Sequence, residues 1–193
     1  CAFVRLSTSV GLDKVIDMAQ KLGMRSVVPG RQPVNEWRVL TFTLGVISVT
    51  PLEMANITAT IAGDGVHHDP IFVSKVVEPD GRVLFDETGR PGTRVLDPDV
   101  AHCAVSILHG PLDDPSGTAS RKGIPGHDAF GKTGTNDNKV SSAFLGGTSN
   151  LVTDVWHGMP DEDVPGAGFG AGVPNGIWRG FMSPALRGTA DAP

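Results

Sequence analysis

The sequence contains no tyrosine, only two cysteines and no long apolar run. None of its apolar stretches approaches the roughly 18 residues that a membrane-spanning helix needs, so no such helix is predicted. Two cysteines exclude a disulfide-rich scaffold. A net charge of -5 argues against nucleic-acid binding and provides no basic patch for an anionic membrane surface. The length of 193 residues is enough for one domain with its own hydrophobic core.

The segment Phe130-Gly-Lys-Thr-Gly-Thr135 is the most informative one in the chain. Side chains alternate across a strand, so Thr133 and Thr135 share one face. Two hydroxyls on one face can hold a carboxylate, and the ammonium of Lys132 supplies the opposite charge. Gly134 leaves room for a close approach to the backbone. The segment therefore predicts an anion site, although these four residues alone are more often a solvated strand end.

Two β-rich runs follow this segment, Ser141–Gly147 and Leu151–His157, and the turn-forming residues 148–150 separate them. Three successive strands with short connections predict an antiparallel meander. A closing helix is expected from about Pro174, containing Ile177–Met182.

Helices and one hairpin are predicted upstream of the meander. The first helix is residues 12–22, ended by Gly23. The second is residues 51–62, capped by Thr50, with Leu52, Ala55, Ala59 and Ala62 on one face. The third begins at Asp97-Pro98, and a buried stripe is predicted on it before Gly110, formed by Val100, Ala104, Ile107 and Leu108. Residues 71–77 and 83–85 flank Pro79-Asp-Gly81, which predicts a hairpin off the main sheet. Residues 25–40, rich in Pro, Arg and Gly, are predicted to be a loop.

The order of these segments resembles the transpeptidase domain of penicillin-binding proteins, of the bifunctional class A peptidoglycan synthase type and actinobacterial-like. The segments that carry the resemblance are Lys132–Thr135, Ala143–Thr148, Leu151–Trp156, Thr43–Gly45, Val49–Ala55, Ala59–Ala62 and Gly117–Ala119, which cover nearly the whole chain in the right order. The resemblance implies an α/β (α+β) fold, an antiparallel sheet flanked by helices, which is serine β-lactamase/transpeptidase-like but incomplete.

Two motifs of that family are missing. No serine is followed three residues later by lysine, and no asparagine is preceded two residues earlier by serine or tyrosine. Such enzymes carry their serine nucleophile in a Ser-x-x-Lys motif. Cys1–Leu6 resembles the helix that directly follows the Ser-x-Asn motif. Residues 1–193 are therefore expected to be the C-terminal part of one transpeptidase domain, inactive by itself.

The resemblance also implies roles for the residues of the anion site. Thr133 and Thr135 hydroxyls would hold the terminal carboxylate of a stem peptide ending in D-Ala-D-Ala, or that of a β-lactam. Lys132 would add positive charge, and the backbone N–H of Thr135 would form half of an oxyanion hole. Gly134 completes the motif. We expect no cofactor, no metal and no nucleic-acid partner, and an extracytoplasmic location, with a membrane anchor only outside this chain.

Two other classes of function remain open. One is a non-catalytic remnant that keeps the penicillin-binding fold, and the other is a D,D-carboxypeptidase or β-lactamase-like hydrolase. The long segment 25–95 and the closing helix favour a synthase over the compact hydrolases.

Four further features are interpreted conservatively. His67 and His68 lie beside Asp69, but adjacent side chains on a strand diverge, so no metal site is predicted. Trp156 and Trp178 are predicted to be core residues. The segment Gly166–Gly172 fits no phosphate-loop pattern and is predicted to be a flexible connector. Cys1 and Cys103 form either a disulfide or two free thiols, and the thiols are favoured.

Overall fold

The structure, a computed structural model, describes residues 2–26 and 40–191. Its elements are α1 (Ala2–Val10), α2 (Leu12–Lys21), the 3-10 helix η1 (Leu40–Leu44), α4 (Pro51–Ala62), β1 (Val66–His67), β2 (Lys75–Val77), β3 (Val83–Asp86), β4 (Thr93–Arg94), α5 (Pro98–Asp113), β5 (Phe130–Thr135), the 3-10 helix η2 (Asp137–Lys139), β6 (Ser141–Gly147), β7 (Val152–Gly158) and α6 (Val173–Ala185).

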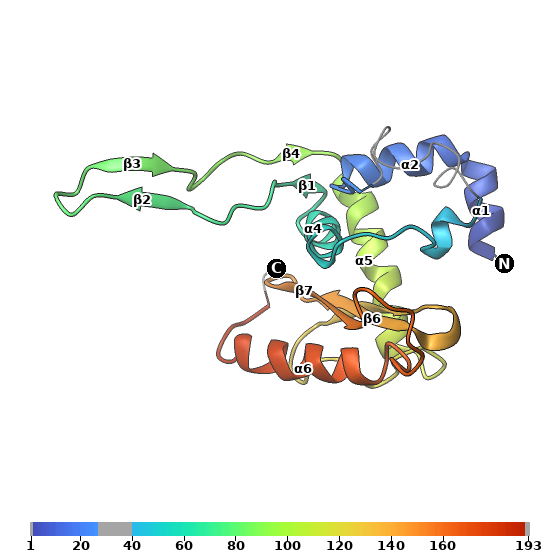
Figure 1. Cartoon of the computed structure of the whole chain (residues 1–193). Coiled ribbons are helices and arrows are strands. Elements are labelled where there is room, and N and C mark those ends of the chain that lie inside the picture. The colour runs from blue at the N-terminus through green and yellow to red at the C-terminus, as the bar shows by residue number, and fades with distance from the viewer. Residues whose placement is uncertain (1, 27–39, 192–193) are drawn as a thin grey trace.

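The predicted meander is confirmed as a three-stranded antiparallel sheet in the order β5-β6-β7. Phe144 of β6 pairs with Thr133 of β5 on one side and with Val155 of β7 on the other. Helix α6 covers one face of this sheet, while α4 and α5 lie on the other side (Figure 1). The predicted mixed fold, an antiparallel sheet flanked by helices, is confirmed.

The main hydrophobic core lies between the sheet and α6. The rings of Phe144 and Trp178 pack with centroids 4.8 Å apart, and both residues have no exposed surface. The indole of Trp178 also donates a hydrogen bond to Gly146 O at 3.1 Å. Met182 and Leu186 follow Trp178 at helical spacing and enter the same core.

Helix α4 begins as its sequence predicts. The Thr50 side chain accepts a hydrogen bond from the Glu53 N–H, and the Glu53 carboxylate accepts one from the Thr50 N–H, which completes a capping box. The Ser26 N–H and hydroxyl also donate to this carboxylate. Burial would raise the pKa of Glu53, but these hydrogen bonds from Ser26 and Thr50 lower it to about 2.

The buried stripe predicted on α5 is wrong in part, because only Ala104 and Leu108 of its four residues are even half-buried. On α5, Val100 and Ile107 are 55% and 67% exposed, whereas Ala101 and Leu112 are the buried residues. The helix also continues through Gly110 and Pro111 to Asp113, because tertiary packing overrides the weak local propensity of these residues.

On α4, the apolar residues predicted to share one face are not the buried ones. Leu52 and Ala59 are exposed on this helix, and the buried residues are Ile57, Thr58 and Thr60. Trp156 on β7 is also 43% exposed, so only one of the two predicted core tryptophans is in the core.

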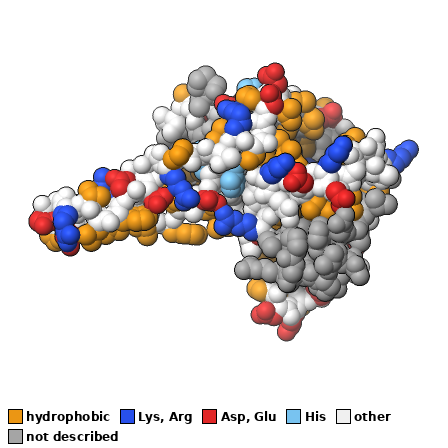
Figure 2. All heavy atoms as spheres, turned by 90° about the horizontal axis from the view of Figure 1, so that it is seen from above, with side chains coloured by type: hydrophobic (Ala, Val, Ile, Leu, Met, Phe, Trp, Pro, Cys, Tyr) orange, Lys and Arg blue, Asp and Glu red, His pale blue; other side chains and the backbone are white. Residues whose placement is uncertain are grey.

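The predicted hairpin is confirmed as a separate two-stranded sheet, β2-β3, whose strands begin at Lys75 and Val83. We call residues 71–86 the arm; it projects from the body of the molecule beyond the short β1-β4 pair (Figure 1). Every residue of β2 and β3 is exposed. Figure 2 shows hydrophobic side chains along one long side of the arm and charged ones along the other.

Some predictions lie partly outside the described residues. Most of the predicted loop at residues 25–40 lies outside the described residues. Cys1 also lies outside them, so the disulfide between Cys1 and Cys103 stays a prediction. Cys103 is an exposed free thiol on α5. Within residues 2–26 and 40–191, no helix is long and apolar enough to cross a membrane. Over the same ranges, no three His, Cys, Asp or Glu side chains are grouped as a metal ion would need.

Candidate active site

Strand β5 carries the predicted Lys-Thr-Gly-Thr segment at an edge of the sheet, because among the described strands it pairs only with β6. Asn136 and Ser141 form a hydrogen-bonded pair at its end, with Asn136 N–H donating to Ser141 O at 3.0 Å. Hydrogen-bonded and non-hydrogen-bonded pairs alternate along an antiparallel ladder. The backbone N–H and C=O groups of Thr133 and Thr135 are therefore directed away from β6, toward the open edge.

The two predicted threonines line one cleft of about 510 Å³. Thr133 is half-buried and Thr135 is exposed at this cleft. The other lining residues come from the turn after α5 and from the segment before α6: Thr118, Lys122, Phe169, Gly170, Ala171 and Gly172. The hydroxyl of Thr133 donates to the hydroxyl of Thr118 at 2.9 Å. A row of hydroxyls with a lysine beside it is suited to an anion.

Lys132 lies on the opposite face of the strand, but its ammonium turns back to Thr133. The Nζ donates to Thr133 O at 2.8 Å and to Thr133 Oγ1 at 3.3 Å. Partial desolvation lowers the pKa of Lys132. An ammonium that is partly removed from water interacts more strongly with an incoming anion than a solvated one does.

Gly134 is the fourth predicted site residue, and a Cβ added to it would make only an ordinary contact, 3.4 Å from Ala143 Cβ. The backbone of Gly170 packs over it: a Cβ added to Gly170 would lie 2.7 Å from Gly134 O and 3.0 Å from Gly134 N. The Gly170 N–H also donates to Thr135 Oγ1 at 3.3 Å. The predicted close approach to this glycine thus comes from the chain itself.

The segment Gly166–Gly172 is held on the sheet at several points, which the prediction of a flexible connector misses. The N–H groups of Gly166 and Ala167 both donate to Lys139 O, and the buried Ser142 hydroxyl donates to Ala167 O at 2.8 Å. The segment can pack against β5 and β6 because residue 170 has no side chain. The glycines of this segment were therefore the feature of the sequence that could have indicated the packing. The segment forms one wall of the cleft.

Thr118 and Lys122 line the cleft but were not predicted as site residues. Position 118 appeared only as part of a small-residue turn, and position 122 carried no prediction. The Lys122 ammonium donates to Ala171 O at 2.6 Å and so ties the two walls of the cleft together. Nothing in the local sequence indicates that contact, because it joins residues 49 positions apart.

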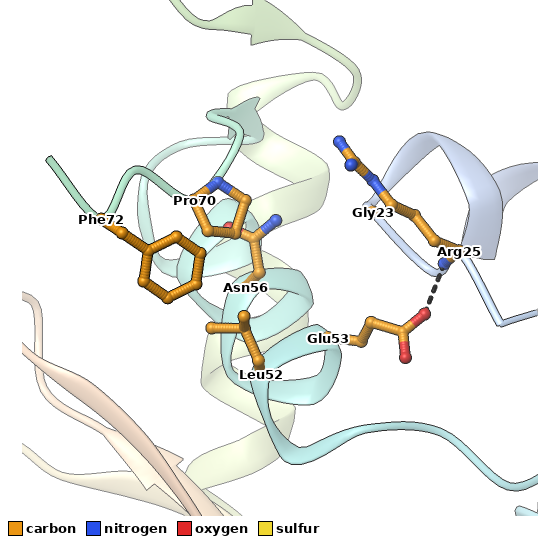
Figure 3. Close-up of a pocket in the computed structure, with 7 residues that line it drawn as sticks. All are labelled: Gly23, Arg25, Leu52, Glu53, Asn56, Pro70 and Phe72. Carbon is orange, nitrogen blue, oxygen red and sulfur yellow. Dashed lines mark hydrogen bonds between the residues drawn. The ribbon is translucent and has the colours of Figure 1, made fainter. Parts of the chain in front are cut away.

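A second, smaller hollow of about 160 Å³ lies where the arm meets the body (Figure 3). Leu52, Pro70 and Phe72 form its apolar side, and Phe72 is 87% exposed. On the other side the Arg25 N–H donates to Glu53 at 2.7 Å. This hollow contains none of the predicted site residues.

An antiparallel sheet between helices, with a Lys-Thr-Gly-Thr edge strand over a cleft, places the molecule in the β-lactamase/transpeptidase-like fold. Within that fold, the chain belongs to the family of penicillin-binding protein transpeptidase domains, whose family model matches residues 1–148.

Curated relatives agree with this membership. The chain is 30% identical to penicillin-binding protein 1A of Mycobacterium tuberculosis over 96% of its own length and 25% of that protein. It is 28% identical to penicillin-binding protein 1A of Aquifex aeolicus over 96% of its length and 24% of that protein. The chain therefore spans about a quarter of the length of these relatives.

Solved structures show the same similarity. The penicillin-binding protein PonA1 of Mycobacterium tuberculosis superposes with a TM-score of 0.78 and 29% identity, over 93% of this chain and 51% of that one. PonA1 has also been solved in complex with penicillin V. Penicillin-binding protein 1A of Haemophilus influenzae shares the fold, with a TM-score of 0.81 and 22% identity over 100% of this chain and 33% of that one.

Proposed function

We propose that this chain is the substrate-holding part of a peptidoglycan D,D-transpeptidase domain. Its ligand is the carboxylate end of a stem peptide ending in D-Ala-D-Ala, and a β-lactam carboxylate occupies the same place. The observation that carries the proposal is the cleft at the β5 edge, which Thr133 and Thr135 line and which the Lys132 ammonium approaches through Thr133. The named relatives, which are penicillin-binding proteins, support it.

In the proposed reaction, a serine attacks the peptide carbonyl, the terminal D-alanine leaves, and the amine of a neighbouring stem takes the acyl group. The hydroxyls of Thr133 and Thr135 hold the terminal carboxylate, while Lys132 supplies positive charge. The N–H of Thr135, directed to the open edge of the sheet, donates to the oxyanion that develops on the attacked carbonyl.

The nucleophile is not among these residues. The chain contains no Ser-x-x-Lys and no Ser-x-Asn motif. In the proposal the attacking serine belongs to a part of the domain outside these 193 residues. The chain alone then binds a carboxylate ligand reversibly and forms no acyl-enzyme. We further propose that the complete protein works on the cell-wall side of the cytoplasmic membrane, where its substrate lies.

The direct test is a titration of the 193-residue chain with N-acetyl-D-alanyl-D-alanine, followed by backbone amide chemical shifts. The shifts should concentrate at Thr118, Thr133–Thr135 and Gly170. The C-terminal amide of the same dipeptide is the matched control ligand, since it lacks only the charge. We expect Thr133→Val to weaken binding of the acid by about tenfold, because a hydrogen bond to a charged group is lost.

Thr8→Val is the matched control variant, because Thr8 is exposed on α1 and its hydroxyl bonds only within that helix. It should bind like the unmodified chain. Equal binding of the acid and the amide by the unmodified chain would refute the proposal. In the complete domain, Lys132→Ala should abolish acylation by a fluorescent penicillin without unfolding the protein, and normal labelling would remove the role of this lysine.

A further inference from the structure

The hydroxyl of Thr133 already has two hydrogen-bonding partners in the protein before any ligand binds. It donates to Thr118 Oγ1 at 2.9 Å, and it accepts from Lys132 Nζ at 3.3 Å. Thr118 and Thr133 both line the cleft, although 15 positions separate them in the sequence. The contact therefore exists only because the turn after α5 is folded against β5.

The capacity of a hydroxyl explains why this contact matters. A hydroxyl has one proton to donate and two lone pairs that accept. A carboxylate accepts only, so Thr133 must turn its single proton from Thr118 to the ligand. Thr118 can rotate its own hydroxyl and donate back to Thr133. Thr133 then accepts from Lys132 and from Thr118, and its proton is left in the remaining direction, toward the cleft.

We propose that Thr118 is a positioning residue for the carboxylate site, acting through Thr133 by reversing the direction of their hydrogen bond when an anion enters. The inference rests on the proposed function of the cleft and adds to it a residue of that site. No bond between heavy atoms forms or breaks; two hydroxyl protons rotate. Donation from Thr118 also polarises the Thr133 hydroxyl and makes it a stronger donor to the anion.

The backbone on both sides of Thr118 is closely packed, so the turn holds Thr118 beside β5. A Cβ on Gly117 would lie 2.5 Å from Pro111 O and 2.7 Å from Gly110 O, which shows how closely this turn packs on the end of α5. The Ala119 N–H donates to Pro111 O at 2.9 Å, and the Ala119 side chain is buried.

The Thr118 side chain itself is exposed at the cleft and contributes little to the core. Thr118→Val keeps the branched shape and removes only the hydroxyl, so we expect the fold to survive. Thr118→Ser keeps the hydroxyl and should restore binding. If valine disturbs the turn, Thr118→Ala removes the hydroxyl without a branched replacement, and amide spectra of each variant report whether it is folded.

The experiment is a double-mutant cycle on the 193-residue chain, with Thr118→Val, Thr133→Val and both together, titrated with N-acetyl-D-alanyl-D-alanine and its amide. Thr118→Val should weaken binding of the acid by about threefold, and binding of the amide should not change. In the Thr133→Val background the same change should have no further effect, since Thr118 acts through Thr133.

The outcomes separate the two proposals. If the unmodified chain does not prefer the acid to the amide, the proposed function fails. If it does prefer the acid, but Thr118→Val binds the acid as well as the unmodified chain does, the positioning role fails. A loss that persists in the Thr133→Val background would also overturn it, because Thr118 would then contact the ligand directly or act through the fold. Failure of Thr118→Ser to restore binding would contradict it too.

Discussion

The β5-β6-β7 sheet and the β2-β3 arm are both antiparallel strands joined by short turns, yet only the sheet encloses a core. The sheet buries Phe144 against Trp178 on α6, whereas the apolar residues of the arm, such as Val76 and Phe85, are 39% and 43% exposed. The strands pair antiparallel in both regions, although the β2-β3 register shifts between Val76 and Val77. The sheet buries its apolar side chains because helix α6 covers it, whereas no helix covers the arm among the described residues. The anion site lies on the covered sheet.

The two regions also differ in how they hold charge. On the arm, Lys75 and Asp86 form an exposed cross-strand ion pair at 2.8 Å. In the sheet, Asp154 alternates with Val155, which packs on the core, so it lies on the opposite face, on the side of α4. Within residues 2–26 and 40–191 no ion pair offsets its burial. Solvent screens the charges of the arm, while burial penalises the charge in the sheet.

The largest expected effect tests the core itself. Trp178→Ala should lower the free energy of unfolding by about 3–5 kcal/mol, because it leaves a cavity beside Phe144 and removes the hydrogen bond from the indole to Gly146 O. Phe85→Ala on the arm should change the free energy of unfolding by less than about 0.5 kcal/mol. Urea denaturation followed by circular dichroism measures both. Similar losses in the two variants would mean that the arm is packed in solution.

A smaller effect is expected at the wall of the cleft. Gly170→Ala places a methyl against the carbonyls of Gly134 and Ala143, and should cost about 1–3 kcal/mol and weaken ligand binding. Gly176→Ala is the matched control, since its Cβ would have no neighbour within 4 Å and it lies on α6. It should stabilise the protein by about 0.5–1 kcal/mol. A fully stable Gly170→Ala would show that the segment does not rest on the sheet.

The smallest effect compares the two carboxylates. Desolvation raises the pKa of Asp154 from 3.8 to about 6, so the charged form destabilises the folded state as the pH rises from about 4 through 6. Asp154→Asn should therefore raise the free energy of unfolding by about 1–2 kcal/mol at pH 8 and leave it nearly unchanged at pH 4.

Asp86→Asn serves as the comparison on the arm. Hydrogen bonds from the Lys75 side chain and then from Thr88 lower the pKa of Asp86 to about 2. Its stabilising contribution is present above pH 4 and is lost as the pH falls through 2, which is the opposite sign from Asp154. Because Asp86 is on the solvent-exposed arm, we expect no measurable change at pH 8. Urea denaturation at pH 4 and pH 8 reports both variants; destabilisation of Asp154→Asn at pH 8 would contradict the assigned sign.

Much of the fold could be predicted from the sequence, because local signals determined it. The capping box at Thr50 and Glu53, the turn at Pro79–Gly81 and the alternation in β5 each predict one element correctly. The faces of α4 and α5 could not be predicted, since apolar spacing does not say which side a neighbour covers. Val100 and Ile107 have helical spacing but lie in solvent.

The candidate site was predicted only in part, because some of its residues are brought together by tertiary contacts and not by local sequence. The positions of Thr133 and Thr135 on one face follow from strand geometry. Thr118 and Lys122 reach the cleft through a turn and through contacts between distant segments, which no spacing in the sequence indicates. The family resemblance identified the turn at residues 117–119 without indicating its contact to Thr133.

Lys132 stands in the middle of a strand whose outer edge faces no other strand of residues 2–26 and 40–191. Such an edge accepts a second copy of the protein as readily as a peptide, and natural proteins often block unwanted pairing there with a lysine. The same side chain thus has a second consequence, which concerns solubility rather than ligands. Removing its charge would leave the edge open to aggregation between molecules.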